Sequence, residues 1–324
     1  MPSLKEIQAP VDDYIHQFEG VFREAIKSRV SLLDIIMRYL TRRKGKQMRP
    51  LFVYLSADLC GGVTESSHRA AALIELLHTA TLVHDDVVDI SDERRGFFSI
   101  NALWKNKVAV LAGDYLLSRG LLLAVENSEL DILRIVSAAT REMSEGELLQ
   151  IEKARRLDIR EDVYYEIIRK KTATLISSCC AAGASSAGAS PDLIAMMSSF
   201  GEKVGMAFQI KDDLFDYQSV NNTGKPNGID IRDQKMTLPL IFFLANCSSA
   251  DKRFVINTVK NYNTDRKRIA KVIDMVVQAG GINYAKTRMH QYRDEALTML
   301  DALPDRPSRQ SLADLVRYTT DRDR

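Results

Sequence analysis

One stretch of the chain, residues 78–96, constrains the fold more than any other. It reads HTATLVHDDVVDISDERRG and places three carboxylates, Asp85, Asp86 and Asp89, within about one helical turn. The residues before them, 71–83, are apolar nearly all round. A helix of that kind is central and buried rather than at the surface. The chain must therefore build its core around a helix whose end carries clustered negative charge.

Helical periodicity recurs along almost the whole chain, and strand signals are scarce. Besides a helix from Thr64 to about Ile90, the pattern predicts helices over 4–28, 30–42, from Pro50 to Gly61, 100–123, 127–153, 160–182 and 190–217, then three to five shorter ones. We find no interdomain linker and no tandem repeat. The sequence thus predicts an all-α fold, a single domain over residues 1–324 with long helices around a central cavity.

Composition excludes several classes of protein. A net charge of +2 gives no bulk case for binding nucleic acid. The four cysteines lack paired spacing, which favours reduced thiols and a cytoplasmic location. The N-terminus lacks the pattern of a signal peptide. No run of about 18 uncharged apolar residues is present, so no transmembrane segment is expected.

A second triplet of carboxylates, Asp212, Asp213 and Asp216, repeats the spacing of the first on a separate predicted helix. Like charges one turn apart destabilise a solvated helix by roughly 0.2–0.5 kcal/mol, and cost more where water is excluded. One triplet alone is explained as a solvated acidic helix end, but two on buried helices indicate a clamp for divalent cations. Carboxylate oxygens that leave other positions to water and phosphate favour Mg²⁺ or Mn²⁺.

Basic residues cluster near both triplets. Each alone is more simply a solvated charge, but together they exceed what one diphosphate needs, and two diphosphates would balance them. They are Lys46, Arg49, Arg94, Arg95, Lys170, Lys171, Lys225 and Lys235.

The ordered motifs resemble those of a known family. GKQMRP, LVHDDVVD with RRG after it, KKT, FQIKDD, LFD and a GK…K-x-T-L-P ending follow one another from Gly45 to Pro239. This set is similar to that of the trans-isoprenyl diphosphate synthases (polyprenyl synthetases), and especially to bacterial long-chain, octaprenyl-type members. The resemblance implies an all-α isoprenoid synthase fold, a homodimer and Mg²⁺, three ions per site with Mn²⁺ as a substitute. It also implies head-to-tail 1'-4 condensation of isopentenyl diphosphate onto an allylic diphosphate.

The resemblance further implies a role for each matching residue. The metal ligands would be Asp85, Asp89, Asp212 and Asp216. The allylic diphosphate would contact Arg94, Lys171, Lys225 and Lys235. Isopentenyl diphosphate would contact Lys46, Arg49, His78 and Arg95. Thr172 and Gln209 would lie beside the reacting carbons and stabilise positive charge. The sequence departs from the family where Phe97-Phe98-Ser99 replaces a proline-containing polar turn.

Product length is expected to depend on Ala80 and Thr81, which precede Asp85 by five and four residues. They would lie roughly 6–7.5 Å below the metal end of the helix. Small side chains there leave a channel open, as in long-chain synthases that supply quinone side chains, although they also serve helix packing. Gly201 and Gly205 predict close backbone approach along the other helix.

Other interpretations compete with a long-chain synthase. A short- or medium-chain farnesyl or geranylgeranyl diphosphate synthase differs only in product length. A class I terpene cyclase requires a second motif of the NDxxSxxxE kind, but here position 216 is Asp and position 220 is Val. A non-catalytic subunit that regulates a partner synthase would typically lose one triplet. Exact product length, the preferred primer, and any partner or transient membrane contact for product release do not follow from the sequence.

Overall fold

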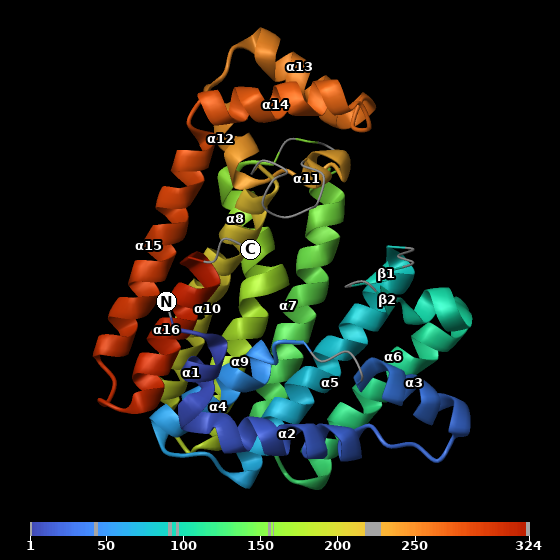
Figure 1. The fold of residues 1–324 in the computed structure, drawn as a ribbon, viewed down its shortest axis with the longest axis vertical. Coiled ribbons are helices and arrows are strands. Elements are labelled where there is room, and N and C mark those ends of the chain that lie inside the picture. The colour runs from blue at the N-terminus through green and yellow to red at the C-terminus, as the bar shows by residue number, and fades with distance from the viewer. Residues whose placement is uncertain are drawn as a thin grey trace.

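The structure, a computed structural model, describes residues 2–41, 45–89, 97–154, 157, 159–217 and 228–321 in full and residues 93–94 by their backbone. In chain order the helices are α1 (Leu4–Gln8), η1 (Ala9–Val11), α2 (Asp12–Ala25), α3 (Ser31–Thr41), α4 (Met48–Cys60), α5 (Glu65–Val88), α6 (Ile100–Glu126), α7 (Leu130–Ala154), α8 (Glu161–Ile168), η2 (Arg169–Ala173), α9 (Thr174–Ser186), α10 (Pro191–Phe215), α11 (Ile229–Arg232), α12 (Leu238–Asn246), α13 (Ser249–Asn261), α14 (Arg266–Gln278), α15 (Gly281–Asp301) and α16 (Pro307–Asp321). The prediction of an all-α fold is confirmed. In Figure 1, α7, α10 and α15 run along the long axis, α2 crosses the lower end, and α13 and α14 lie across the upper end.

The predicted boundaries hold for the long helices and fail in three places. The segment 4–28 is not one helix, because Pro10 has no N–H to continue the ladder and the chain forms a 3-10 turn there. The helix expected to follow Pro50 begins two residues earlier, at Met48. Beyond α10 the described chain forms six helices rather than three to five. The division into one domain over 1–324 stays a prediction.

The central helix is α5, as the sequence predicts. Thr64 caps its start: the Thr64 hydroxyl accepts from the backbone N–H of Ser67, and Ser67 reciprocates. The helix contacts α6, α4, α9 and α2. Most of its first four turns is buried, whereas Asp85, Val88 and Asp89 at its carboxyl-terminal end are exposed to solvent.

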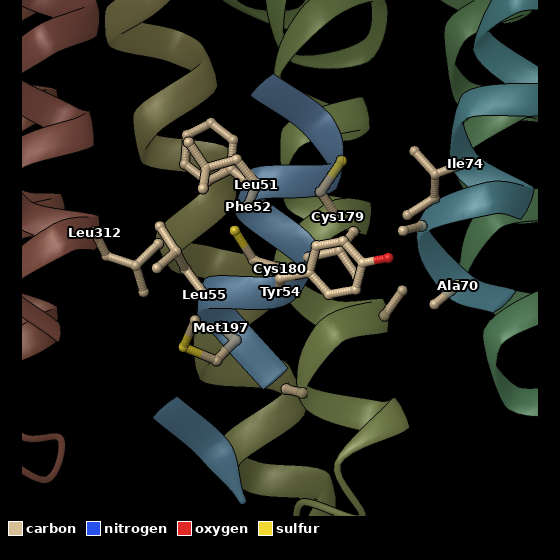
Figure 2. Close-up of a cluster of buried hydrophobic side chains, with 14 of the residues drawn as sticks. Leu51, Phe52, Tyr54, Leu55, Ala70, Ile74, Cys179, Cys180, Met197 and Leu312 are labelled. Carbon is tan, nitrogen blue, oxygen red and sulfur yellow. The ribbon is translucent and has the colours of Figure 1, made fainter. Parts of the chain in front are cut away.

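The main apolar core lies around α4, which contacts α5, α9 and α16, and it includes side chains of α10. Figure 2 shows Phe52 and Tyr54 of α4 among Ile74, Cys179 and Met197 of these neighbours. Burying one large apolar side chain stabilises a fold by about 1.5–3 kcal/mol. This core fixes α5 and α10 in one frame, and α9 contacts both helices.

The prediction of close approach at Gly201 and Gly205 is confirmed. A Cβ at Gly201 would lie 2.7 Å from the carbonyl oxygen of Ile176, and one at Gly205 would lie 2.4 Å from Cα of Ala173. Side chains cannot occupy such gaps, so α10 runs backbone to backbone against α9 and η2. One turn after Gly205, α10 presents Gln209 to the same neighbours.

The stretch that departs from the family turn forms a small hairpin. Strands β1 (Glu93–Arg94) and β2 (Phe97–Phe98) pair antiparallel, with Glu93 opposite Phe98. Both phenylalanines are exposed, and the Ser99 side chain caps α6 by accepting from the N–H of Ala102. The two paired strands therefore lie between α5 and α6 in the chain.

One helix bears on the expectation that no segment spans a membrane, which stays a prediction. Among the described residues α6 is long and apolar enough to cross a membrane, by length and composition only, and 33% of its most apolar window is buried. Its charges are few and spaced, so a search for an uninterrupted apolar run misses it. Its inner face is packed on α5 along much of its length.

Candidate active site

The first carboxylate triplet divides between two faces of α5. Asp85 and Asp89 are exposed, whereas Asp86 is only 4% exposed. Consecutive residues differ by about 100° around a helix, so the middle carboxylate turns inward while its neighbours turn to solvent. The two accessible carboxylates are thus those that the sequence predicts as metal ligands.

The second triplet divides in the same way at the end of α10. Asp212 is exposed, whereas Asp213 is 8% exposed. The Tyr164 hydroxyl donates to Oδ2 of Asp213 at 2.7 Å, and the Gln209 amide donates to Oδ1 at 2.8 Å. Burial raises the pKa of Asp213 to about 7, and the two hydrogen bonds oppose that rise. Asp213 is therefore held by its neighbours inside the protein.

The third carboxylate, Asp216, accepts hydrogen bonds from the first residues of the next helix, α11. Its two oxygens accept from the backbone N–H groups of Ile229 and Asp230, at 2.8 and 3.1 Å, at the start of α11. Burial raises the pKa of Asp216, and these backbone hydrogen bonds act against the rise. Each carboxylate oxygen retains a second lone pair for a further ligand.

Lys171 and Thr172 lie in η2, a single turn of π-helix. Such turns are rare and often occur at functional sites. A Cβ at Gly146 would lie 2.7 Å from Cβ of Lys170, so α7 also approaches this turn closely. The Thr172 hydroxyl donates to Oε1 of Gln209 at 2.7 Å. The close packing of α7 and α10 thus fixes the position of this turn, so that Thr172 lies within hydrogen-bonding distance of Gln209.

A cavity of about 160 Å³ opens beside this turn and brings together four predicted site residues, Lys171, Thr172, Gln209 and Lys235. Its lining also includes Gln150, Tyr164, Asp213, Asp230, Gln234 and Thr237. Sequence reasoning assigned no role to Tyr164 or Asp230. Tyr164 has only its place eight residues before Thr172 to mark it, and Asp230 lies in a short helix with no periodic pattern.

Both lysines of the cavity are held by carboxylates. Lys171 forms an ion pair with Glu147, and its Nζ lies 3.4 Å from Oε1 of Gln150. Lys235 lies 3.6 Å from Asp230, whose pKa is raised to about 6, chiefly by burial and then by the nearby carboxylate of Asp216. These pairings keep two ammonium groups at the cavity wall, where an anionic ligand can take over part of their contacts.

The described residues assigned to isopentenyl diphosphate lie on α5, on α4 and just before α4. The Arg49 guanidinium makes two hydrogen bonds to Glu75, of 2.8 and 3.0 Å. Nζ of Lys46 donates to the Tyr318 hydroxyl at 3.0 Å, so the C-terminal helix α16 also reaches this region. His78 is half-buried on α5. The contribution of Tyr318 was not predicted, because nothing in the sequence links positions so far apart.

Three predicted residues fall partly or wholly outside the described chain. Arg95 and Lys225 lie beyond the described residues, and Arg94 is described only as part of β1.

The two residues assigned to product length differ in their surroundings. Ala80 has no exposed surface and lies in the apolar cluster shared with α3 and α6. Thr81 is half-buried, and its hydroxyl donates to the carbonyl of His78 at 2.8 Å. The accessible side of α5 is therefore the side of Thr81.

The donor set suits a hard divalent cation. The accessible oxygens at both helix ends are carboxylates, which such ions prefer. Within the described ranges, no group of three or more His, Cys, Asp or Glu side chains gathers at one point. An ion here would thus take few ligands from the protein and the rest from water and a bound anion, as Mg²⁺ usually does.

Comparison with known proteins agrees with this site. Residues 30–276 match the family model described as polyprenyl synthetase. The chain is similar to an all-trans-nonaprenyl-diphosphate synthase (geranyl-diphosphate specific) from Rhodobacter capsulatus, 36% identical over 98% of both chains. Further relatives that match over 90% or more of this chain are named octaprenyl diphosphate synthase, heptaprenyl diphosphate synthase component 2 and geranylgeranyl diphosphate synthase.

Solved structures show the same fold. A decaprenyl diphosphate synthase from Rhodobacter capsulatus superimposes with a TM-score of 0.94 at 32% identity, over 99% of this chain and 100% of that one. A polyprenyl synthase from Caulobacter crescentus, complexed with calcium and isoprenyl diphosphate, gives a TM-score of 0.89 at 30% identity, over 99% and 98%. With its paired carboxylate triplets and lysine-lined cavity, this chain belongs to the polyprenyl synthetase family and is a prenyltransferase of the trans-prenyl diphosphate synthase type.

Proposed function

We propose that the chain is an all-trans long-chain polyprenyl diphosphate synthase, which adds isopentenyl diphosphate repeatedly to an allylic diphosphate primer by 1'-4 condensation. The observation that carries this proposal is the cavity in which two lysines, Lys171 and Lys235, lie beside Thr172 and Gln209. Positive charge binds a diphosphate leaving group, and the neutral oxygens nearby suit a carbocation.

In this proposal Mg²⁺ is held at the two helix ends, by Asp85 and Asp89 on α5 and by Asp212 and Asp216 at the end of α10. When bound, Mg²⁺, with three ions per site and Mn²⁺ as a substitute, neutralises the diphosphate and assists its departure as a Lewis acid. The accessible oxygens of these side chains support the assignment. So does the Caulobacter crescentus relative, which is complexed with calcium, another cation that prefers oxygen ligands.

The basic side chains divide between two diphosphates. We assign Arg94, Lys171, Lys225 and Lys235 to the allylic diphosphate, and Lys46, Arg49, His78 and Arg95 to isopentenyl diphosphate. The pair between Arg49 and Glu75 supports the second set, since it holds the guanidinium in one orientation before a ligand arrives. Preorganised charge of this kind lowers the cost of binding and of ionisation.

Thr172 and Gln209 stabilise the allylic cation through their oxygens. Both are half-buried at the cavity wall and hydrogen-bonded to each other at 2.7 Å. Their oxygens replace part of the solvation that water would give, while the surrounding apolar residues keep water from capturing the cation. In this assignment the chain supplies no nucleophile, because the second substrate attacks the cation.

Small residues at Ala80 and Thr81 support a long product of the kind used as a quinone side chain. A short- or medium-chain product is the alternative, since relatives are named for both classes.

We also propose that the enzyme is a cytoplasmic homodimer. Its four cysteines are free thiols, as expected in a reducing compartment. One face of α6 exposes six large apolar side chains: Leu103, Val110, Leu111, Leu121, Leu122 and Val125. An apolar stripe of this length on a helix indicates a partner surface, and a second copy of the chain fits a closed symmetric assembly. The relative named as component 2 makes a different partner subunit the alternative.

One assay tests the reaction and the product together. The purified chain is incubated with Mg²⁺, labelled isopentenyl diphosphate and allylic primers of several lengths, and the dephosphorylated products are sized. We expect extended products beyond geranylgeranyl length, lost on chelation of the metal. Products that stop at geranylgeranyl or shorter would support the short-chain alternative. No elongation with any primer would contradict the proposed function and favour a non-catalytic subunit.

A further inference from the structure

We propose that Tyr164 and Asp213 are positioning residues that fix the side-chain amide of Gln209, so that the Thr172 hydroxyl presents only lone pairs to the cavity. This inference rests on the proposed function, and it assigns Asp213 a task other than binding metal. It concerns a chain of side chains from three elements, α8, η2 and α10.

The four side chains form one continuous line of hydrogen bonds. The Tyr164 hydroxyl donates to Asp213 at 2.7 Å, the Gln209 amide donates to the other Asp213 oxygen at 2.8 Å, and Thr172 donates to the Gln209 carbonyl at 2.7 Å. All three distances lie in the range of well-formed hydrogen bonds.

The chemistry of the groups gives this line a direction. Both oxygens of Asp213 accept hydrogen bonds, one from the Tyr164 hydroxyl and one from the Gln209 amide nitrogen. The amide nitrogen of Gln209 must therefore face Asp213, which leaves its oxygen toward Thr172. Thr172 has one hydroxyl proton and donates it to that oxygen. The remaining lone pairs of Thr172 are then free to face positive charge in the cavity.

Burial makes the arrangement hard to reverse. Tyr164 is 3% exposed and Asp213 is 8% exposed, so water cannot easily replace either partner. If the amide of Gln209 turned over, its oxygen would face an Asp213 oxygen, and its nitrogen would face the Thr172 hydroxyl. The buried carboxylate would lose a donor and meet a second acceptor, which is unfavourable where dielectric screening is weak.

Backbone packing holds the ends of the line in place. The close contact at Gly205 sets α10 against Ala173, directly after Thr172. At the other end of the line, Tyr164 lies on α8 at the cavity wall, and the centre of its ring is 5.5 Å from that of Tyr165. Small movements of either end would change the direction of the Thr172 oxygen.

The test is Tyr164→Phe in the full-length enzyme, which removes one hydroxyl and keeps the ring. We expect kcat for isoprene addition to fall about tenfold, less than for removal of a group that meets the charge directly. We expect KM for both diphosphates to stay within about twofold, because no residue that we assign to diphosphate binding changes. The matched control is Tyr165→Phe, which removes a hydroxyl that accepts from Arg288 outside this line.

A second variant, Asp213→Asn, keeps the shape but adds a donor that conflicts with Tyr164 or Gln209. We expect a larger fall in kcat than for Tyr164→Phe, again at nearly constant KM. If both variants only lower the melting temperature while kcat per folded enzyme equals that of Tyr165→Phe, the positioning role is overturned. The parent enzyme in the same assay reports separately on the proposed function, since its failure to elongate would contradict that proposal alone.

Discussion

The carboxyl-terminal ends of α5 and α10 carry the same triplet spacing in different surroundings. At the end of α5 the triplet precedes a short hairpin, and its outer members, Asp85 and Asp89, are exposed. At the end of α10 only Asp212 is exposed. Asp213 is enclosed by Tyr164 and Gln209, and Asp216 holds the start of α11. One end thus offers its two outer carboxylates to solvent, whereas at the other end two of the three form hydrogen bonds within the protein.

This difference shows that identical spacing does not imply identical roles. Helix geometry turns the middle carboxylate inward at both ends, but only tertiary neighbours decide what it contacts. We infer that α5 supplies solvent-exposed ligands, whereas α10 supplies ligands and also side chains that line the reaction cavity.

The largest expected effect tests whether both ends bind metal. We expect Asp85→Ala and Asp212→Ala each to reduce kcat/KM by at least about a thousandfold, because each removes an accessible ligand of an ion that stabilises the leaving group. Steady-state assays with Mg²⁺ measure this. The control is Asp131→Ala, which removes an exposed carboxylate on α7 that pairs with Arg134. Normal turnover in either cluster variant would disprove the clamp.

The sequence predicts the ends of these helices better than it predicts their environment. Apolar periodicity and the Thr64 cap locate α5, because those signals are local. The triplet spacing and the Gly205 contact are also readable along one helix. The π-helical turn at Lys171 and the hydrogen bond from Tyr164 to Asp213 are not, because each involves contacts between elements distant in sequence. The resemblance to a family implied roles for the site residues, but the hydrogen bonds of Asp213 and Asp216 follow only from the three-dimensional fold.

A second prediction asks whether the product grows along α5 rather than α10. We expect Thr81→Phe to shorten the product by at least one isoprene unit, since the half-buried threonine faces accessible space. We expect Ala80→Phe to shorten it too, with a stability loss of about 1–3 kcal/mol, because Ala80 is fully buried against α6. Sizing of products measures the first effect and urea unfolding the second. Thr81→Val, nearly equal in volume, is the control and should leave length unchanged. An unchanged product distribution in both Phe variants would place the channel elsewhere.

A third prediction tests the exposed face of α6, which continues from the hairpin at the end of α5. We expect Leu111→Asp to convert a dimer to monomers, because it places a charge in the middle of the apolar stripe. Sedimentation velocity at several concentrations measures the change. The comparison variant is Ser118→Asp, at an exposed position of the same helix that is already polar, where we expect a smaller effect on dimer formation. A chain that sediments as a monomer before any substitution would contradict the homodimer and leave a different partner subunit to cover α6.

The smallest expected effect concerns the packing that brings α10 to the reaction cavity. A Cβ added at Gly205 would lie 2.4 Å from Cα of Ala173, a backbone atom that cannot move without shifting η2. We expect Gly205→Ala to lower the free energy of unfolding by about 1–3 kcal/mol, as overpacking does. The control is Gly20→Ala within α2, where nothing lies within 4 Å and the gain in helix propensity should stabilise by roughly 0.5–1 kcal/mol. Urea unfolding of both variants gives the two signs.

Because the displaced turn carries Lys171 and Thr172, kcat in Gly205→Ala should fall as well, whereas Gly20→Ala should keep it. A stable Gly205→Ala variant with parental kcat would show that the reaction does not depend on close packing of α10 against η2. The difference between the two helix ends would then lie only in the surroundings of their carboxylates.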